Sequence, residues 1–369
     1  MTSFTPFRIE DAQSASLSPL ITARKAGVLN EKRCNKMIRQ ITAAENQLGS
    51  KQDIVFTHQE ETLWIGAILD GHGNRSGKNP YTSNYGTFNF CVEAIKTLKE
   101  NGGLCEILSA PITKDANPAI LLQQALGNEA IKYKTDMLAT GATLALVQVR
   151  HIEDKIKVST LSVGDSTIII YRNGELIYET TPHDYTNQAE LDRLLQENRF
   201  KDPSNKLLDG PNFELLDDTF IVNRMGKYLN TKKITLAMTQ SIGHLEYSAN
   251  SQTIVEPLGA LGLCPEIREF ELDDTDDINI KVFSDGVSDV TISSDREFLA
   301  SSDAQETVDF ATNRWKQEWK YCQRSKYEDG KDNKETIHFQ PYKFASDGMD
   351  DVSCVFWQQL ECKDSNEDQ

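Results

Sequence analysis

Asp side chains recur where apolar stretches of this sequence begin or end. Such stretches are typical of buried strands, and a rigid strand can hold an oxygen ligand in place at its open end. Carboxylates without a nearby Cys or His set suit magnesium or manganese, and two such ions about 4 Å apart can activate water for attack on phosphorus. A single Asp of this kind is more often a turn or cap residue, so the pattern matters only if several converge. The carboxylates concerned are Asp53, Asp70, Asp165, Asp285 and Asp350.

The stretch Thr62 to Gly73, with the sequence TLWIGAILDGHG, shows this pattern most clearly. Its first part is almost wholly apolar, which predicts a buried strand, and it ends in Asp, Gly, His and Gly. Another apolar run, Ile54 to Thr57, precedes it across a short polar turn, so an antiparallel hairpin is expected. Asp53 begins one strand and Asp70 ends the other, which places both carboxylates at the same end of the pair.

The elements that would position these residues follow an α+β pattern, because strands succeed one another in hairpin order instead of alternating with helices. Further strands are expected at Thr143 to Val149, Ile156 to Gly164, Thr167 to Tyr171, Glu175 to Glu179, Ile234 to Met238, Ile278 to Phe283 and Val352 to Trp357. Apolar spacing and cap signals predict helices at Asn35 to Asn46, Phe88 to Glu100, Asn117 to Leu138, Asn187 to Asn198 and Asp303 to Trp319.

Strands near both ends of the chain favour one domain, residues 1–360, over two domains in series. Two polar segments, near 184–232 and 321–344, lack a clear hydrophobic period and are expected to be insertions at the surface. Residues 361–369 are expected to form a charged tail.

The composition excludes several classes of function. The formal net charge is −17, and a surface this acidic repels phosphate backbones and anionic lipid, so nucleic-acid and membrane partners are not expected. Seven scattered Cys without a CxxC pair argue against a disulfide framework and against a zinc site. We find no signal peptide and no membrane-spanning run. A monomer of the cytoplasm or nucleus is therefore expected.

Seven short motifs occur in an order that resembles the metal-dependent protein serine/threonine phosphatases of the type 2C (PPM) family. Each motif alone is weak, but the ordered set spans roughly residues 50–357 and is specific. The motifs are Lys51-Gln52-Asp53, Asp70-Gly71-His72-Gly73, Gly141-Ala142-Thr143, Val163-Gly164-Asp165-Ser166, Thr239-Gln240-Ser241-Ile242-Gly243, Ser284-Asp285-Gly286-Val287-Ser288-Asp289 and Asp350-Asp351-Val352-Ser353.

The resemblance implies a fold of two packed antiparallel β-sheets flanked by α-helices, an αββα sandwich. It also implies an enzyme that hydrolyses phosphoserine and phosphothreonine in a phosphorylated protein, using a hydroxide that bridges two magnesium or manganese ions. Asp70 would bridge the two ions, and the Gly71 carbonyl would bind the second. Asp285 and Asp350 would complete the first ion's ligands. Asp53 would contact the site largely through metal-bound water.

The same resemblance implies that His72 is the general acid that donates to the leaving Ser or Thr oxygen; the alternative is a turn histidine bonded to a neighbouring carboxylate. Asp289 would serve a weaker third metal, for which Asp136 lies about two positions from the expected partner. Gly164 and Asp165 would shape the sheet edge behind the site. Packing and strand roles are expected for Thr143 and Ser353.

The sequence also departs from the family pattern. Family members often carry a phosphate-binding Arg just before the first acidic motif, but the equivalent position here is near Leu48. Arg75, Lys51 or Lys78 could replace it, with a solvated surface role as the alternative for each. Two further departures are Gln52, where many members have Glu, and His244, where Asp is usual.

Two other functions remain open at this point. The missing Arg and the two insertions suggest a catalytically weak pseudophosphatase that acts as a binding or regulatory module. A two-metal hydrolase of a non-protein phosphoester is the third possibility. The sequence does not identify the protein substrate, the pathway or the role of the insertions.

Overall fold

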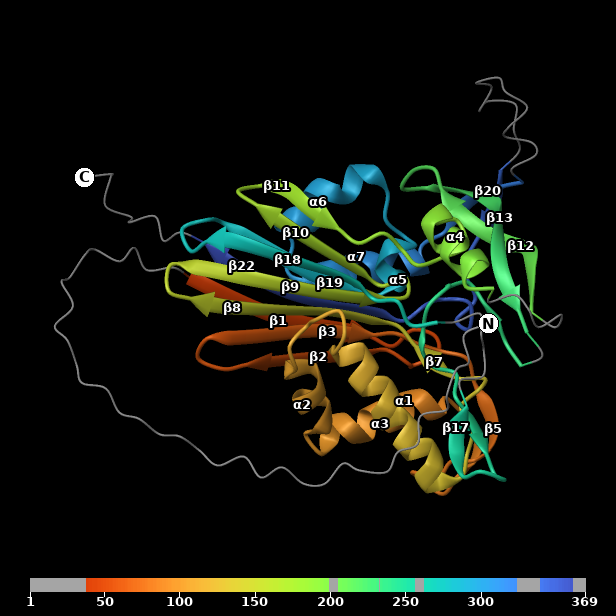
Figure 1. Ribbon diagram of the computed structural model, residues 1–369. Helices are drawn as coiled ribbons and strands as arrows, with labels where there is room; N and C mark the ends of the chain where they lie inside the picture. The colour runs from red at the N-terminus through yellow and green to blue at the C-terminus, as the bar shows by residue number, and fades with distance from the viewer. Residues whose placement is uncertain (1–37, 199–204, 232, 256–261, 324–338, 361–369) are drawn as a thin grey trace, which may run out of the picture. The chain divides into compact units, whose positions relative to one another are not determined.

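The computed structural model describes residues 38–198, 205–231, 233–255, 262–323 and 339–360. The chain divides into two units, Met1–Lys36 and Met37–Gln369, and every described residue belongs to the second. Two five-stranded antiparallel sheets form the centre of this second unit (Figure 1). The first sheet has the order β1 (Ile38–Asn46), β22 (Val352–Leu360), β19 (Ile278–Phe283), β10 (Thr167–Arg172) and β11 (Glu175–Glu179). The second has the order β18 (Glu266–Asp273), β9 (Lys155–Val163), β8 (Leu144–Ile152), β3 (Leu63–Leu69) and β2 (Ile54–Gln59).

The two sheets pack face to face through one apolar core. In the second sheet Trp64 and Ile68 of β3 point into this core, where the Trp64 ring lies 6.1 Å from the ring of Trp357 in the first sheet. The alternate β3 residues, including Ile65 and Leu69, belong instead to the core beneath the helices. Since β3 is buried on both faces, its sequence is apolar throughout and does not alternate.

Helices cover the outer face of each sheet (Figure 1). Asn89 caps the helix Phe90–Glu100 by accepting from the Val92 backbone N–H, and Asn117 caps the helix Pro118–Tyr133. The second sheet packs against α1 (Phe90–Glu100), α2 (Gly103–Ser109) and α3 (Pro118–Tyr133). The first sheet packs against α5 (Asp285–Ser288) and α7 (Ala304–Lys316), with η1 (Ser293–Asp295) and α6 (Arg296–Ser301) between them along the chain. The predicted αββα sandwich is confirmed.

One predicted helix is wrong. Residues 38–46 of the expected helix Asn35 to Asn46 form strand β1, and residues 35–37 lie outside the described residues. Every residue from Ile38 to Asn46 has a partner in the C-terminal strand β22. Pairing between the two ends of the fold therefore overrides a local helical pattern, because strand pairing depends on a partner far away in the sequence.

The two expected insertions lie in one sheet. The first contributes helix α4 (Gln188–Gln196) and a long hairpin of β12 (Lys206–Leu215) and β13 (Phe220–Asn230). The second overlaps β20 (Trp319–Cys322) and contains β21 (Gln340–Tyr342). β20 pairs in parallel with β13 and antiparallel with β21, while β14 (Thr235–Leu236) pairs with the other end of β13. We call β12, β13, β14, β20 and β21 the flap sheet.

Short strands complete the described fold. A three-stranded sheet of β15 (Ile242–Gly243), β7 (Gly141–Ala142) and β4 (Gly71–His72) continues from the end of β3. Two hairpins lie outside it, β5 (Arg75–Lys78) with β6 (Tyr85–Phe88), and β16 (Glu246–Ser248) with β17 (Thr253–Val255). Over the described ranges we find no helix with the length and apolar character needed to span a membrane.

Candidate metal centre and active site

Four strand ends bring carboxylates together at one end of the sandwich. In the second sheet Asp53 directly precedes β2 and Asp70 directly follows β3, and the adjoining residues Ile54 and Leu69 are paired. In the first sheet Asp285 lies two residues beyond β19, and Asp350 two residues before β22. These two strands are also antiparallel neighbours, so their acidic ends meet. The predicted convergence of Asp53 and Asp70 at one end of their hairpin is confirmed.

The carboxylates are close enough to perturb one another. Burial raises the pKa of Asp53 and Asp285 to about 7 and that of Asp350 to about 8, and it holds the pKa of Asp70 well above its ordinary value. The charge of Asp285 is the next contribution for both Asp70 and Asp350, and the charge of Asp165 is the next for Asp285. Crowded carboxylates of this kind are stabilised by a compensating cation.

The donor set fits a hard divalent cation. Oδ2 of Asp53 accepts a hydrogen bond from Ser353 Oγ at 2.7 Å, whereas its Oδ1 is buried and has no hydrogen-bond partner in the described part of the chain. Oδ1 of Asp285 is buried and unpartnered in the same way. Among the described residues, no three His, Cys, Asp or Glu side chains are arranged to hold an ion as they stand.

Asp351, next to the proposed ligand Asp350, has a different part in the site. Its carboxylate accepts hydrogen bonds from the backbone N–H groups of Gly49 (2.8 Å) and Gln52 (2.7 Å) and from Ser50 Oγ (3.0 Å). It is almost fully buried. Asp351 therefore ties the loop that leads into Asp53 to the start of β22, a contact that the paired-Asp motif did not reveal.

Two hydrogen bonds between Asp70 and Thr143 hold the turn after β3. Thr143 donates its backbone N–H to the Asp70 carbonyl at 2.8 Å, and its hydroxyl accepts from the Asp70 N–H at 3.2 Å. At Gly71 a Cβ atom would overlap the side chains of Val92 and Gln52, so no larger residue fits there. Thr143 has the packing role expected of it.

Gln52 faces away from the carboxylates. Its Oε1 accepts from Asn89 Nδ2 at 2.6 Å, and its Nε2 donates to Asn74 Oδ1 at 3.2 Å. Asn89 also donates to the His72 carbonyl at 3.0 Å. The position where many family members have Glu thus supports the turn that carries His72.

His72 lies beside the carboxylate cluster but bonds to none of its members. Nε2 of His72 lies 2.9 Å from Ser241 Oγ and 3.0 Å from His244 Nε2, while its Nδ1 is buried without a hydrogen-bond partner in the described part of the chain. Burial and then the nearby His244 ring lower the pKa of His72 well below its usual range. The alternative of a turn histidine bonded to a carboxylate does not describe this arrangement.

A cleft of about 190 Å³ separates the acidic strand ends from the flap sheet. Asp285 and Asp289 line one side, with Asp165 beside them, and Arg224 and Tyr228 of β13 line the other. Desolvation and then the charge of Asp285 raise the pKa of Asp289. The motif positions in the sequence do not predict that Arg224 lies here.

Asp165 lies in the cleft, not only behind it. Burial raises its pKa to about 7, and its Oδ1 is buried and unpartnered within the described ranges. The sequence predicts a structural role for Asp165, and the structure adds that its carboxylate faces the same space as Asp285. Asp136 is exposed in the segment between α3 and β7, and its carboxylate accepts from the Leu138 N–H at 3.3 Å.

The three basic side chains that the sequence suggested as replacements for the missing phosphate-binding Arg do not line the cleft. Arg75 donates to the Asp136 carbonyl at 2.6 Å and lies over the Phe88 ring, while Lys51 and Lys78 are exposed. None of these three lines the cleft. Arg224 does line it, is half-buried, and makes no hydrogen bond or ion pair with the described residues.

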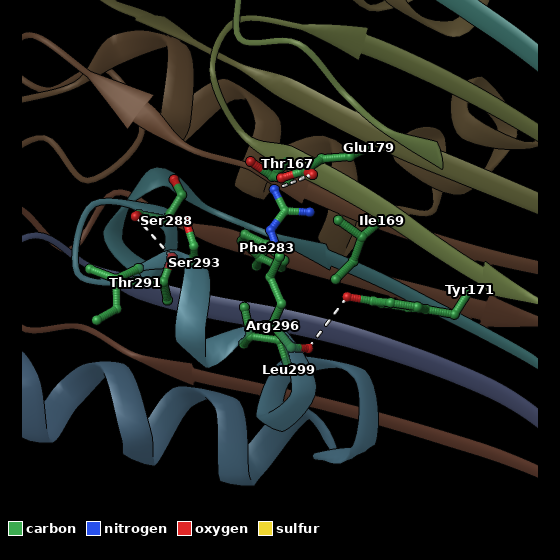
Figure 2. A pocket seen from close by; sticks show the side chains of 11 residues that line it. Thr167, Ile169, Tyr171, Glu179, Phe283, Ser288, Thr291, Ser293, Arg296 and Leu299 are labelled. Atoms are coloured by element: carbon green, nitrogen blue, oxygen red, sulfur yellow. Dashed lines mark hydrogen bonds and ion pairs between the residues drawn. The ribbon is translucent and has the colours of Figure 1, made fainter. Parts of the chain in front are cut away.

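A second cavity, of about 110 Å³, lies between the first sheet and the segment from α5 to α6 (Figure 2). Arg296 crosses it and pairs with Glu179 at 2.8 Å, and Thr291 Oγ1 donates to the Ser288 carbonyl at 3.0 Å. The cavity shares Ser288 with the cleft but contains no carboxylate of the acidic cluster. Because its charged groups neutralise each other, it is a poorer candidate for the chemistry than the cleft.

The chain matches the sequence model of the protein phosphatase 2C family over residues 44–326, well over half of its length. None of the curated proteins compared with it matches. Similar solved structures include a sex-determining protein of C. elegans (14% identity, 86% of this chain and 64% of that chain, TM-score 0.49) and the S. agalactiae serine/threonine phosphatase (16% identity, 87% and 99%, TM-score 0.43). Another is the catalytic domain of the phosphatase PstP in complex with two manganese ions (14% identity, 88% and 100%, TM-score 0.41). The match includes the whole second sheet, strands β10, β11 and β19 of the first sheet and the acidic motifs up to Asp289, and this chain belongs to the protein phosphatase 2C family.

Proposed function

We propose that this protein is a metal-dependent phosphatase that hydrolyses phosphoserine and phosphothreonine in protein substrates. The observation that carries the proposal is the convergence of Asp53, Asp70, Asp285 and Asp350 from four strand ends, with buried oxygens that lack a partner among the described residues. A purely structural role would leave this concentration of negative charge uncompensated.

Magnesium or manganese would be held by oxygen ligands of this chain. We propose that Asp70 is shared between two ions, with the Gly71 carbonyl on the second. Asp285 and Asp350 would serve the first, and Asp53 would act largely through water. Bound ions of this kind supply Lewis-acid charge and activate water for attack on phosphorus. Asp289, exposed in the cleft, would serve a weaker third ion.

We propose that a side chain of the flap sheet binds the phosphoryl group of the substrate. Arg224 is a cation that lines the cleft opposite Asp285 and Asp289 and has no partner among the described residues. Asn212 pairs with it across the β12–β13 hairpin and lines the same cleft. A guanidinium binds phosphate oxygens through two parallel N–H groups, so we propose Arg224 in place of the Arg missing near Leu48.

His72 is the proposed proton donor to the leaving oxygen. Its Nε2 is already engaged with Ser241 and His244, so Nδ1 is the nitrogen that would first take up a proton and then pass it to the leaving oxygen. Asp70 and His72 are separated by a single residue, which keeps the acid and the metal ligands on one turn.

The proposal is tested by phosphate release from a phosphothreonine peptide in manganese, with the Asp70→Asn protein as the control. We expect turnover that disappears with a chelator and in Asp70→Asn. No turnover above that control would reject the enzyme and leave the pseudophosphatase reading. A parallel panel of small phosphoesters separates the remaining possibility, since a non-protein phosphatase would prefer those substrates to the peptide.

A further inference from the structure

Three polar side-chain atoms meet above the bare Cα of Gly141, outside the carboxylate cluster. Gly141 is the middle member of the small sheet, where it pairs with His72 on one side and with Gly243 on the other. A Cβ at Gly141 would overlap His244 Nε2, Ser241 Oγ and His72 Nε2. Only glycine leaves room for the two imidazole rings to meet at this point.

The backbone brings His244 into this position. Gly243 and His244 both have positive φ angles, 94° and 52°, which turn the chain sharply after β15. The His244 N–H then donates to the Thr140 carbonyl at 3.0 Å, and the His244 ring stacks on His72 with 5.2 Å between ring centres. The ring is almost fully buried, so it is held by the fold and not by solvent.

The hydrogen bonds determine which nitrogen of each ring carries the hydrogen. His244 Nδ1 lies 2.9 Å from the Leu138 carbonyl, which only accepts, so Nδ1 carries the hydrogen. Burial lowers the pKa of His244 to about 4, so the ring is neutral at neutral pH and its Nε2 has a lone pair. His72 Nε2, 3.0 Å away, must therefore be the donor between the two rings.

The position of Ser241 agrees with this assignment. Its single hydroxyl hydrogen lies between two acceptors, the carbonyls of Ala142 (3.2 Å) and Ile242 (3.0 Å), which leaves an oxygen lone pair for the His72 Nε2–H at 2.9 Å. The opposite tautomer of His72 would set two nitrogen lone pairs against each other at 3.0 Å.

We infer that His244 is a positioning residue for His72: it fixes the His72 ring with its hydrogen on Nε2 and a lone pair on Nδ1. Nδ1 is then the one open nitrogen of His72, and it is buried without a hydrogen-bond partner in the described part of the chain. The consequence for catalysis rests on the proposed function, whereas the tautomer itself does not. Where Asp is usual in the family, His244 supplies a neutral acceptor instead of a charged one.

The direct test is a long-range proton–nitrogen NMR spectrum of protein labelled with nitrogen-15 at histidine. His72 signals are assigned by their loss in His72→Asn. We expect a protonated Nε2 and an unprotonated Nδ1 in the unaltered protein. In His244→Phe, which keeps a stacking ring but removes the acceptor, we expect a mixture of both His72 tautomers. His244→Gln restores an acceptor near the Nε2 position and should restore the single tautomer.

Kinetics on the phosphothreonine peptide form the second arm. His244→Phe should lower kcat about tenfold or more with KM little changed, because ring positioning affects the chemical step and not the grip on substrate. His244→Gln should recover most of the loss, and His58→Phe, at a half-buried position of the edge strand β2, should change neither constant. Melting temperatures show that each variant is folded.

Two results would overturn the inference: a protonated Nδ1 on His72 in the unaltered protein, or an unchanged His72 tautomer in folded His244→Phe. If the unaltered protein shows no turnover but the NMR result holds, the proposed function fails and the positioning role of His244 stands.

Discussion

At the scale of single residues, the neighbouring Asp350 and Asp351 have separate roles at the start of β22. Asp350 belongs to the crowded carboxylate cluster, whereas the Asp351 carboxylate accepts two backbone N–H groups and one hydroxyl from the loop before β2. A side chain that satisfies backbone donors in this way is a structural anchor. The loop that leads to the proposed ligand Asp53 depends on Asp351, although the two residues lie near opposite ends of the described chain.

Asp351→Asn should therefore destabilise the protein without removing a proposed ligand. The amide retains one accepting oxygen and turns its other atom into a donor that faces N–H groups. We expect a loss of about 2–3 kcal/mol in the free energy of unfolding, measured with a chemical denaturant. Asp347→Asn, in an exposed turn, is the matched control and should change little. Equal stability of the two variants would refute the anchoring role.

Lys281 gives a prediction on pH. Its amine is buried and donates to Ser302 Oγ at 2.7 Å and Thr307 Oγ1 at 3.3 Å, and burial lowers its pKa to about 8 from 10.5. Below pH 8 both the folded and the unfolded chain hold the proton, so the cost of the buried charge is present in full. Between about pH 8 and 10.5 the unfolded state binds more protons, and stability attributable to this group rises with pH.

Lys281→Met should accordingly be the more stable protein near pH 7, by up to about 3 kcal/mol, because burial lowers the pKa of Lys281 from 10.5 to about 8. The advantage should shrink as the pH rises from 8 to 10, because the native amine then loses its charge. Denaturation curves of both proteins across this range measure the difference. An advantage that stays constant with pH would show that the Lys281 charge is not the cause.

At the scale of elements, the flap sheet supplies the side of the cleft that could not be predicted from the sequence. β13 carries Arg224 and Tyr228 into it, and the parallel pairing with β20 ties the first insertion to the second. Tyr228 lies against Gly210 and Gly226, where an added Cβ would approach its ring to within about 3 Å. The hairpin therefore presents one polar face to the acidic strand ends.

Arg224→Ala should weaken binding of a phosphothreonine peptide more than it slows the chemistry. Loss of charge-assisted hydrogen bonds worth about 1.5–3 kcal/mol corresponds to a rise in KM of roughly 10- to 150-fold. Lys227→Ala is the matched control, because Lys227 also lines the cleft but pairs with Asp209 at 3.3 Å. A KM that rises equally in both variants would mean that general positive charge, and not Arg224 itself, attracts the substrate.

The site strands could be predicted from sequence because their signal is local. β2, β3, β19 and the start of β22 are short apolar runs bordered by acidic turns, and each appeared close to its expected bounds. Elements that depend on distant partners were harder: β1 was mistaken for a helix, and the hairpin β12–β13 has no regular apolar period. Their pairing partners lie far away or in another insertion.

The contacts of three site residues could not be predicted for the same reason. Nothing local in the chain indicates that His244 meets His72, that Arg224 faces Asp289, or that Asp351 holds the loop before Asp53. His244 was noticed only as a departure from the family pattern. Each of these contacts joins segments that the sandwich brings together after folding.

At the scale of the whole molecule, the two sheets work as one support for the site. Each contributes an antiparallel pair of strands whose acidic ends meet, and the core around Trp64 and Trp357 fixes one pair relative to the other. A metal site divided between two sheets would depend on how the sheets pack together. The single domain of residues 1–360 stays a prediction, and the pairing of β1 with β22 is consistent with it.

The central claim is that four strand ends together form one site for divalent cations. The measurement that tests it most directly is calorimetric titration of manganese into the unaltered protein, Asp285→Asn and the exposed control Asp115→Asn. The account predicts binding by the unaltered protein and by Asp115→Asn, and at least about tenfold weaker binding by Asp285→Asn with an unchanged circular dichroism spectrum. Equal manganese affinity in all three folded proteins would contradict it.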